Sequence, residues 1–184
     1  APRPAFHNMP SAITASAEVA ADATAAAATY MRVGKISSTK ALVCFRANSG
    51  NKIQARLQSV SGSTPSTTGS VRDFSLMPGT SPSSSFGLAI LSTTRALVVT
   101  GIDRTYGDIM AVLLDISGTS PTILRYLNLS VGGITTIELN VVKLSDNTAY
   151  ASWLGSGSLG ADGLMLRITS DDNIVPLPVA DKLE

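Results

Sequence analysis

A sequence repeat constrains the fold of this chain more than any other feature. Three segments align with one another: KISSTKALVCF from Lys35, ILSTTRALVVT from Ile90 and KLSDNTAYASW from Lys143. The alignment places Ala41, Ala96 and Ala149 at equivalent positions, at intervals of 55 and 53 residues. Repeats of this length indicate one supersecondary unit that is stacked several times along the chain.

A second set of aligned segments follows the first in every repeat. They are ARLQSVSGSTPS from Ala55, AVLLDISGTSPT from Ala111 and GLMLRITSDDNI from Gly163. Val60, Ile116 and Ile168 correspond in this set. Because both sets keep the same order in three copies, chance similarity does not explain them.

The repeat consists of segments with the patterns of β-strands. KALVCF and RALVVT are short apolar runs, typical of strands that are buried on both faces. IQARLQSV and GLMLRI instead alternate apolar and other residues, which is the period of a strand and not of a helix. In each repeat, the apolar segment before the first aligned segment and the Thr/Ser-rich segment at the end of the second one supply two further strands. The sequence therefore predicts an all-β chain with about four strands per repeat.

Four antiparallel strands repeated every 40–50 residues are typical of a β-propeller blade. We expect three four-stranded antiparallel propeller-like repeats over residues 30–81, 82–133 and 134–184. A β-sandwich built from the same strands is the alternative fold. Residues 1–29 precede the repeats as an N-terminal arm, in which AITASAEV favours an extra strand over a short Ala-rich helix.

The pattern LS-x-T-[KR]-A-L-V … V-S-G-[ST] resembles the blade repeats of bacterial and phage surface proteins, including virion fibre and tail proteins. The third repeat departs from it with NTAYASW and ITSDD. The resemblance implies blade geometry and a structural or host-attachment role. It carries over no catalytic residue.

Three blades are too few for a closed propeller, since propellers typically have four to eight. An open array would leave blade faces and strand edges exposed, and such surfaces favour association. Two chains would give six blades, and three chains would give nine blades or three separate modules. We therefore expect an obligate homo-oligomer.

Composition limits the classes of partner. Charged residues are 15% of the chain and the formal net charge is +1, without any basic stretch, so nucleic acid is not an expected partner. No apolar segment approaches the ~18 residues that span a membrane, and no signal peptide is apparent. A neutral surface rich in Ser and Thr is commoner in virion, extracellular and cell-surface proteins, where we expect this one.

The segment GSGSLG at residues 155–160 fits the spacing G-x-G-x-x-G of a dinucleotide-binding turn. That motif requires a following helix, whereas ADGLMLRI alternates as a strand. The repeat aligns GSGSLG with RANSGNK and GIDRTYGD, so we interpret all three as hairpin connections. No cofactor is expected.

The polar residues favour neither an enzyme nor a metal site. His7 is the only histidine and Cys44 the only cysteine, and Cys44 lies in an apolar run that predicts a buried thiol. A catalytic triad or zinc site has too few candidates. Carboxylates of Asp103, Asp108, Asp146 and Asp162 are better explained as solvated turn residues, and residues 170–173 as an Asx-rich turn rather than a calcium site.

The hairpin loops provide the best candidate for ligand binding. Its residues are Asn48, Asp103, Arg104, Tyr106 and Trp153. Tyr and Trp beside small polar residues suit glycan or protein contact, although a core position is the alternative for Trp153. We expect a non-enzymatic structural component of a virion or surface appendage, which binds copies of itself and other virion or surface proteins. A lectin-like or receptor-binding module is the alternative.

Overall fold

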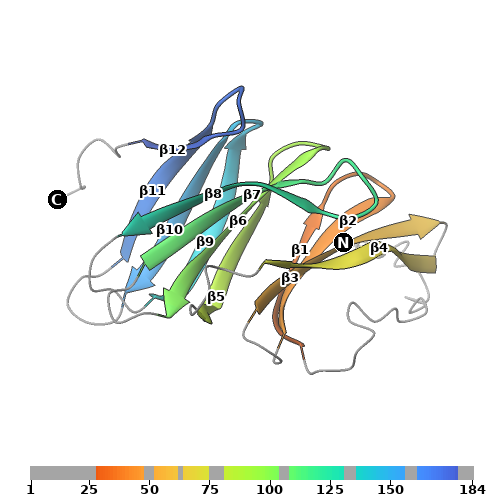
Figure 1. Cartoon of the computed structure of the whole chain (residues 1–184), viewed down its shortest axis with the longest axis horizontal. Helices are drawn as coiled ribbons and strands as arrows, with labels where there is room; N and C mark the ends of the chain where they lie inside the picture. Colours follow the sequence, from red (N-terminus) through yellow and green to blue (C-terminus); the bar gives the residue numbers. More distant parts are fainter. Residues whose placement is uncertain are drawn as a thin grey trace, which may run out of the picture.

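The computed structural model describes residues 28–47, 52–61, 64–74, 81–103, 108–130, 136–155 and 161–177. Within these ranges the chain forms twelve β-strands and no helix, in three antiparallel sheets of four strands (Figure 1). Accordingly, none of these residues belongs to a helix long and apolar enough to cross a membrane. The prediction of an all-β, antiparallel chain is confirmed.

Each sheet is formed by four consecutive strands that pair in chain order. Sheet I contains β1 (Ala28–Lys35), β2 (Lys40–Ala47), β3 (Lys52–Ser61) and β4 (Thr64–Phe74). Sheet II contains β5 (Ser81–Ile90), β6 (Arg95–Asp103), β7 (Asp108–Asp115) and β8 (Thr122–Ser130). Sheet III contains β9 (Thr136–Ser145), β10 (Thr148–Gly155), β11 (Ala161–Ile168) and β12 (Ile174–Leu177).

The strand registers place the aligned alanines at the same point of each sheet. Ala41 pairs with Lys35 and Gln58, Ala96 with Ile90 and Leu114, and Ala149 with Lys143 and Leu166. Residues of different sheets that share such a position are called equivalent below. In the first two strands, equivalent residues are 55 positions apart between sheets I and II and 53 apart between sheets II and III. In the third strands, Val60, Ile116 and Ile168 are equivalent, at intervals of 56 and 52.

The turn between the first two strands is also conserved in geometry. The amide nitrogen of Ile116 donates to the carbonyl of Thr94 at 2.8 Å, and the equivalent bonds join Val60 to Thr39 and Ile168 to Asn147 at 2.8 and 2.7 Å. In each turn a serine hydroxyl accepts a hydrogen bond from the amide nitrogen two residues later, at 3.2, 3.2 and 3.4 Å. The serines are Ser37, Ser92 and Ser145. The aligned Ser-x-Thr or Ser-x-Asn segment is therefore a side-chain-supported turn.

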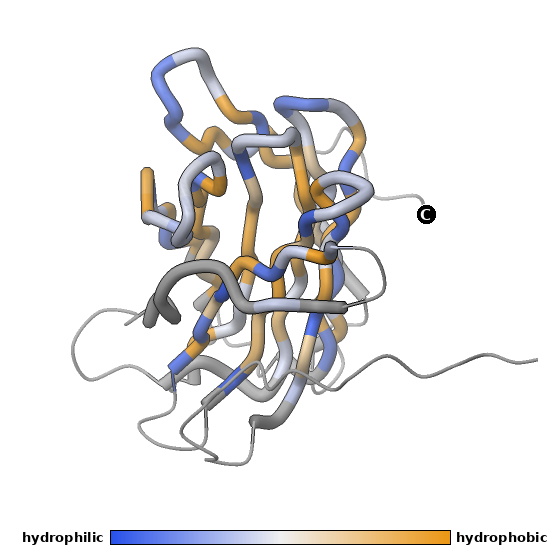
Figure 2. Tube along the Cα trace, turned by 90° about the vertical axis from the view of Figure 1, so that its right-hand side faces the viewer, coloured by the Kyte–Doolittle hydropathy of each residue, from blue (hydrophilic) through white to orange (hydrophobic). Residues whose placement is uncertain are grey.

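Sheet II lies between sheets I and III, and the first strands β1, β5 and β9 follow one another across the array (Figure 1). One apolar cluster joins sheets I and II, with Leu42 and Cys44 against Val98 and Val112. Another joins sheets II and III. Hydrophobic residues accordingly run along the strands in Figure 2.

The sequence pattern of each strand follows from its place in this array. In β6, Ala96 and Val98 face sheet I while Leu97 and Val99 face sheet III, so residues 96–99 form a continuous apolar run. Strand β3 has one buried row, Ile53, Ala55 and Leu57, and it alternates accordingly. The described residues form neither a closed barrel nor a closed ring of sheets, so closure as a propeller stays a prediction. Residues 1–27 of the predicted arm, with His7, lie outside the described residues.

Candidate functional site

The predicted ligand-binding loops fall largely outside the part of the chain that the structure describes. Asn48, Arg104 and Tyr106 are among the residues that are not described. Asp103 is the last residue of β6, where its backbone pairs with Ser81. The structure therefore does not bring the predicted residues together into one described site.

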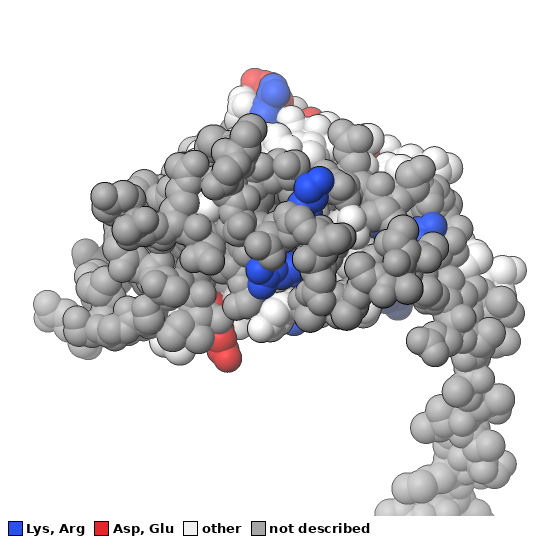
Figure 3. Space-filling view, turned by 60° about the horizontal axis from the view of Figure 1, so that its bottom comes forward, with Lys and Arg blue, Asp and Glu red and all other residues white. Residues whose placement is uncertain are grey.

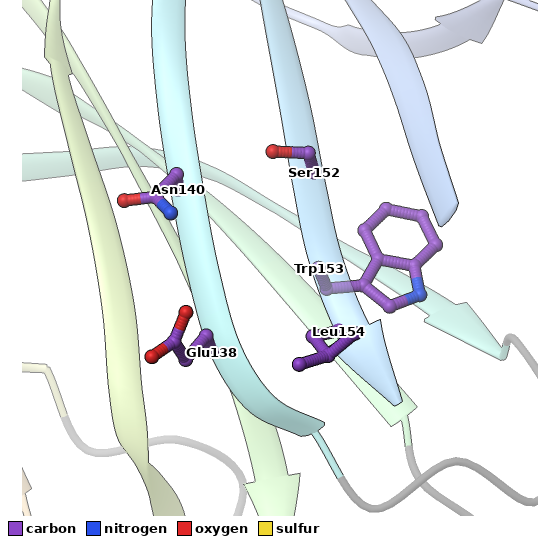
Figure 4. A pocket seen from close by; sticks show the side chains of 5 residues that line it. All are labelled: Glu138, Asn140, Ser152, Trp153 and Leu154. Carbon is purple, nitrogen blue, oxygen red and sulfur yellow. The ribbon is translucent and has the colours of Figure 1, made fainter. Parts of the chain in front are cut away.

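Trp153 lies on a strand, in the core between two sheets, and not on a loop. It belongs to β10, is 5% exposed, and packs in the cluster between sheets II and III with Leu139 and Leu166. Its ring lies on the opposite side of β10 from Ser152 and Leu154 (Figure 4). This position is that of a core aromatic, the alternative considered above.

The glycine-rich segment at residues 155–160 connects two antiparallel strands. Gly155 ends β10, Ala161 begins β11, and Leu154 pairs with Ala161. A dinucleotide-binding turn needs a helix where β11 stands. The interpretation as a hairpin connection is confirmed by this pairing.

Of the carboxylates considered above, the structure describes the side chains of Asp146 and of the acidic residues in the turn at 170–173. Asp146 pairs with Lys143 at 2.6 Å within one exposed turn. Asp172 forms an ion pair with Arg95 of sheet II at 2.6 Å. The side-chain oxygen of the neighbouring Asn173 accepts a hydrogen bond from Arg125 Nε, also of sheet II, at 3.2 Å. Among the described residues no three His, Cys, Asp or Glu side chains lie close enough to hold a metal ion.

Basic residues at one repeat position connect neighbouring sheets. The Lys40 ammonium donates to the carbonyls of Ile116 and Gly118 in the turn after β7, at 2.9 and 3.1 Å. Its equivalent in sheet II is Arg95, which forms the ion pair with Asp172 in the turn after β11. The basic residue at the [KR] position of the sequence pattern thus contacts the next sheet. Sheet III, the last sheet that the structure describes, has Thr148 at this position.

The face of sheet III that points away from sheet II is the best-defined candidate surface. It contains a shallow hollow of about 240 Å³, lined by Glu138, Asn140, Ser152, Trp153 and Leu154 (Figure 4). Three of these residues offer a carboxylate, an amide and a hydroxyl at alternate positions of neighbouring strands. The side chain of Leu154 in this lining is 42% exposed, and those of Val142 and Leu144, farther along β9, are 58% and 56% exposed.

The opposite end of the array also presents apolar side chains. On β1 of sheet I, Met31 and Val33 are 50% and 63% exposed, whereas Val43 and Phe45 of β2 on the same face are buried. Lys and Arg side chains of the described residues appear at several separate places on the face in Figure 3, not as one basic patch. Both ends of the array therefore expose apolar side chains.

Apart from Trp153, the residues of these end faces were not among the predicted site residues, although the sequence contains a signal for them. The third repeat has Asn140 and Ser152 where the second has Gly87 and Val99, which pack against sheet III. Departure of a repeat from its neighbours at positions that face the next unit indicates an end of the array.

No family model, curated protein or solved structure matches the chain.

Proposed function

We propose that this chain is a non-enzymatic structural subunit of a virion or cell-surface appendage, and that it assembles as a homo-oligomer. The observation that carries the proposal is the tandem array of three equivalent sheets with exposed apolar side chains on both end faces. Repeat units of this kind bury their faces against neighbours, and an end that lacks a neighbour favours association.

Each sheet pairs four consecutive antiparallel strands in chain order, which supports our proposal that several chains complete a propeller-type assembly. Three blades fall short of the four to eight that close a ring. A surface with few charges and many Ser and Thr residues supports a virion or extracellular location, with other virion or surface proteins as partners.

Light scattering coupled to size-exclusion chromatography tests this function directly. We expect a mass of at least two chains at micromolar concentration. A monomer at high micromolar concentration would overturn the proposal, because the exposed end faces would then have no role in self-assembly.

The hollow on sheet III supports a second candidate function, binding of a glycan or another receptor. Glu138, Asn140 and Ser152 supply hydrogen-bonding groups of the kind that bind sugar hydroxyls, beside the apolar Leu154. A glycan array that detects binding to the full chain, lost in Asn140→Ala and in Ser152→Ala but kept in Thr93→Ala on a distant turn, would favour this function. Loss of binding in Tyr106→Ala instead would place the site on the predicted loops.

A further inference from the structure

We propose that the outward face of sheet III binds the outward face of sheet I of a second copy of this chain, head to tail. The proposal rests on the proposed function as a self-assembling subunit and specifies the two surfaces that meet. It is based on a comparison of the end faces with their equivalents inside the array.

The first step concerns the end face of sheet III. Leu144 of β9 is 56% exposed, whereas the equivalent Leu91 of sheet II is 0% exposed because it packs against sheet III. Val142 is 58% exposed, whereas the equivalent Ala89 is 5% exposed in the same cluster. These positions are buried wherever a following sheet is present, so their exposure in sheet III marks a missing following sheet.

The second step concerns the end face of sheet I, which is the first sheet among the described residues. Met31 of β1 is 50% exposed, whereas the equivalent residues Phe86 and Leu139 are 1% and 0% exposed against the preceding sheet. Val33 is 63% exposed, and its equivalents are partly buried residues that pack against the two clusters. These positions are covered wherever a preceding sheet is present.

A second copy of the chain is the partner that matches both faces. Each of the two contacts between neighbouring sheets, called joints below, packs the following-side face of one sheet onto the preceding-side face of the next. Among the described residues, β9 of sheet III and β1 of sheet I leave apolar side chains of the two face types exposed. Contact between different faces of identical chains is heterologous, and it closes into a ring when the rotation per chain allows. Two chains joined in this way would form a ring of six sheets.

The joint between copies differs from the internal joints in ways that predict weaker packing. Sheet III has Asn140 and Val142 at the positions where sheets I and II each have one glycine in close contact with the next strand. It also has Thr148 in place of the basic residue that reaches the next sheet. On sheet I, Val43 and Phe45 are already buried within the chain, so the contact involves mainly β1 and β9.

Sedimentation velocity of the full chain over a range of concentrations tests the proposed joint. Val142→Glu on β9 and Val33→Glu on β1 each place a carboxylate in it, and we expect each to raise the dissociation constant roughly tenfold or more. Tyr126→Glu on β8 of sheet II is the matched control, since Tyr126 is 50% exposed and lies on neither end face. Far-UV circular dichroism verifies that the variants keep their β-structure, and Leu144→Ser replaces any Val142 variant that does not fold.

Mixing the two variants distinguishes head-to-tail contact from contact between two identical faces. An equimolar mixture of Val142→Glu and Val33→Glu retains one unaltered pair of faces, so we expect it to recover a species of twice the chain mass. A Val33→Glu variant that associates as strongly as the natural chain would overturn the proposal, because sheet III would then bind sheet III. An oligomeric chain unaffected by both substitutions would overturn this joint alone, whereas a monomeric natural chain would also overturn the proposed function.

Discussion

Gly87 of β5 lies so close to Val141 of β9 that a Cβ atom on residue 87 would be 2.6 Å from Val141 Cγ2 and 2.7 Å from its backbone nitrogen. The first strands of sheets II and III therefore approach to within backbone contact. Gly34 has the same role between sheets I and II, where a Cβ would lie 2.5 Å from Ile90 Cγ1. A residue without a side chain thus sets the spacing at each internal joint.

We predict that Gly87→Ala lowers the free energy of unfolding by about 1–3 kcal/mol, because the new methyl group must displace backbone and not only a flexible side chain. Urea denaturation measures this loss. The control is Gly118→Ala, whose Cβ would find its nearest atom 3.8 Å away, and whose stability should change by less than about 0.5 kcal/mol. Equal effects of the two substitutions would contradict the role of Gly87 as a spacer.

Lys40 provides a second prediction about the joint between sheets I and II. Its ammonium donates to two carbonyls of the neighbouring sheet, at 2.9 and 3.1 Å. Hydrogen bonds from charged groups contribute more than neutral ones, so Lys40→Met should lower the unfolding free energy by about 1–2 kcal/mol in urea denaturation.

Lys143→Met is the matched control for Lys40→Met. Lys143 forms an exposed ion pair with Asp146 three residues away, within one sheet. Exposed pairs of this kind contribute about 0–1 kcal/mol, so the control should lose less stability than Lys40→Met. A larger loss in the control would show that Lys40 is not an important connection between the sheets.

The repeat made most of the fold predictable, because each repeat forms its strands from local patterns that do not depend on the other two. Ala41, Ala96 and Ala149 share one position in three sheets, as the alignment requires. The continuous apolar runs and the alternating segments correctly indicated which strands are buried on two faces and which on one.

The candidate site was harder to predict because it depends on which faces remain uncovered after the sheets pack. An apolar Val142 or Leu144 has the pattern of a core residue, yet both are exposed because no described sheet packs on this face of sheet III. Trp153 has a side chain suited to ligand contact, yet strand alternation directs it between sheets II and III. The contact between Arg95 and Asp172 joins residues far apart in sequence, and no local pattern reveals it.

The turn before β6 allows a third prediction. The Ser92 hydroxyl accepts hydrogen bonds from the amides of Thr94 and Arg95, at 3.2 and 3.1 Å. Removing this acceptor leaves two amides without their partner, so Ser92→Ala should lower the unfolding free energy by about 0.5–1.5 kcal/mol. The adjacent, exposed Thr93 offers the control Thr93→Ala, for which thermal melts should show no comparable shift. A stable Ser92→Ala variant would mean that the backbone bonds alone hold the turn.

The thiol of Cys44 supplies the final prediction. Cys44 is 0% exposed in the cluster between sheets I and II, and its burial raises the pKa of the thiol far above the ordinary range. The thiolate is the reactive form, so the folded chain should react with 5,5′-dithiobis(2-nitrobenzoic acid) at pH 8 at least roughly a hundredfold more slowly than the chain unfolded in urea. The protection should fall in variants that weaken the joint between sheets I and II, such as Lys40→Met, because opening that joint exposes the sulfur. Rapid reaction of the natural, folded chain would be incompatible with the packing of sheet I on sheet II.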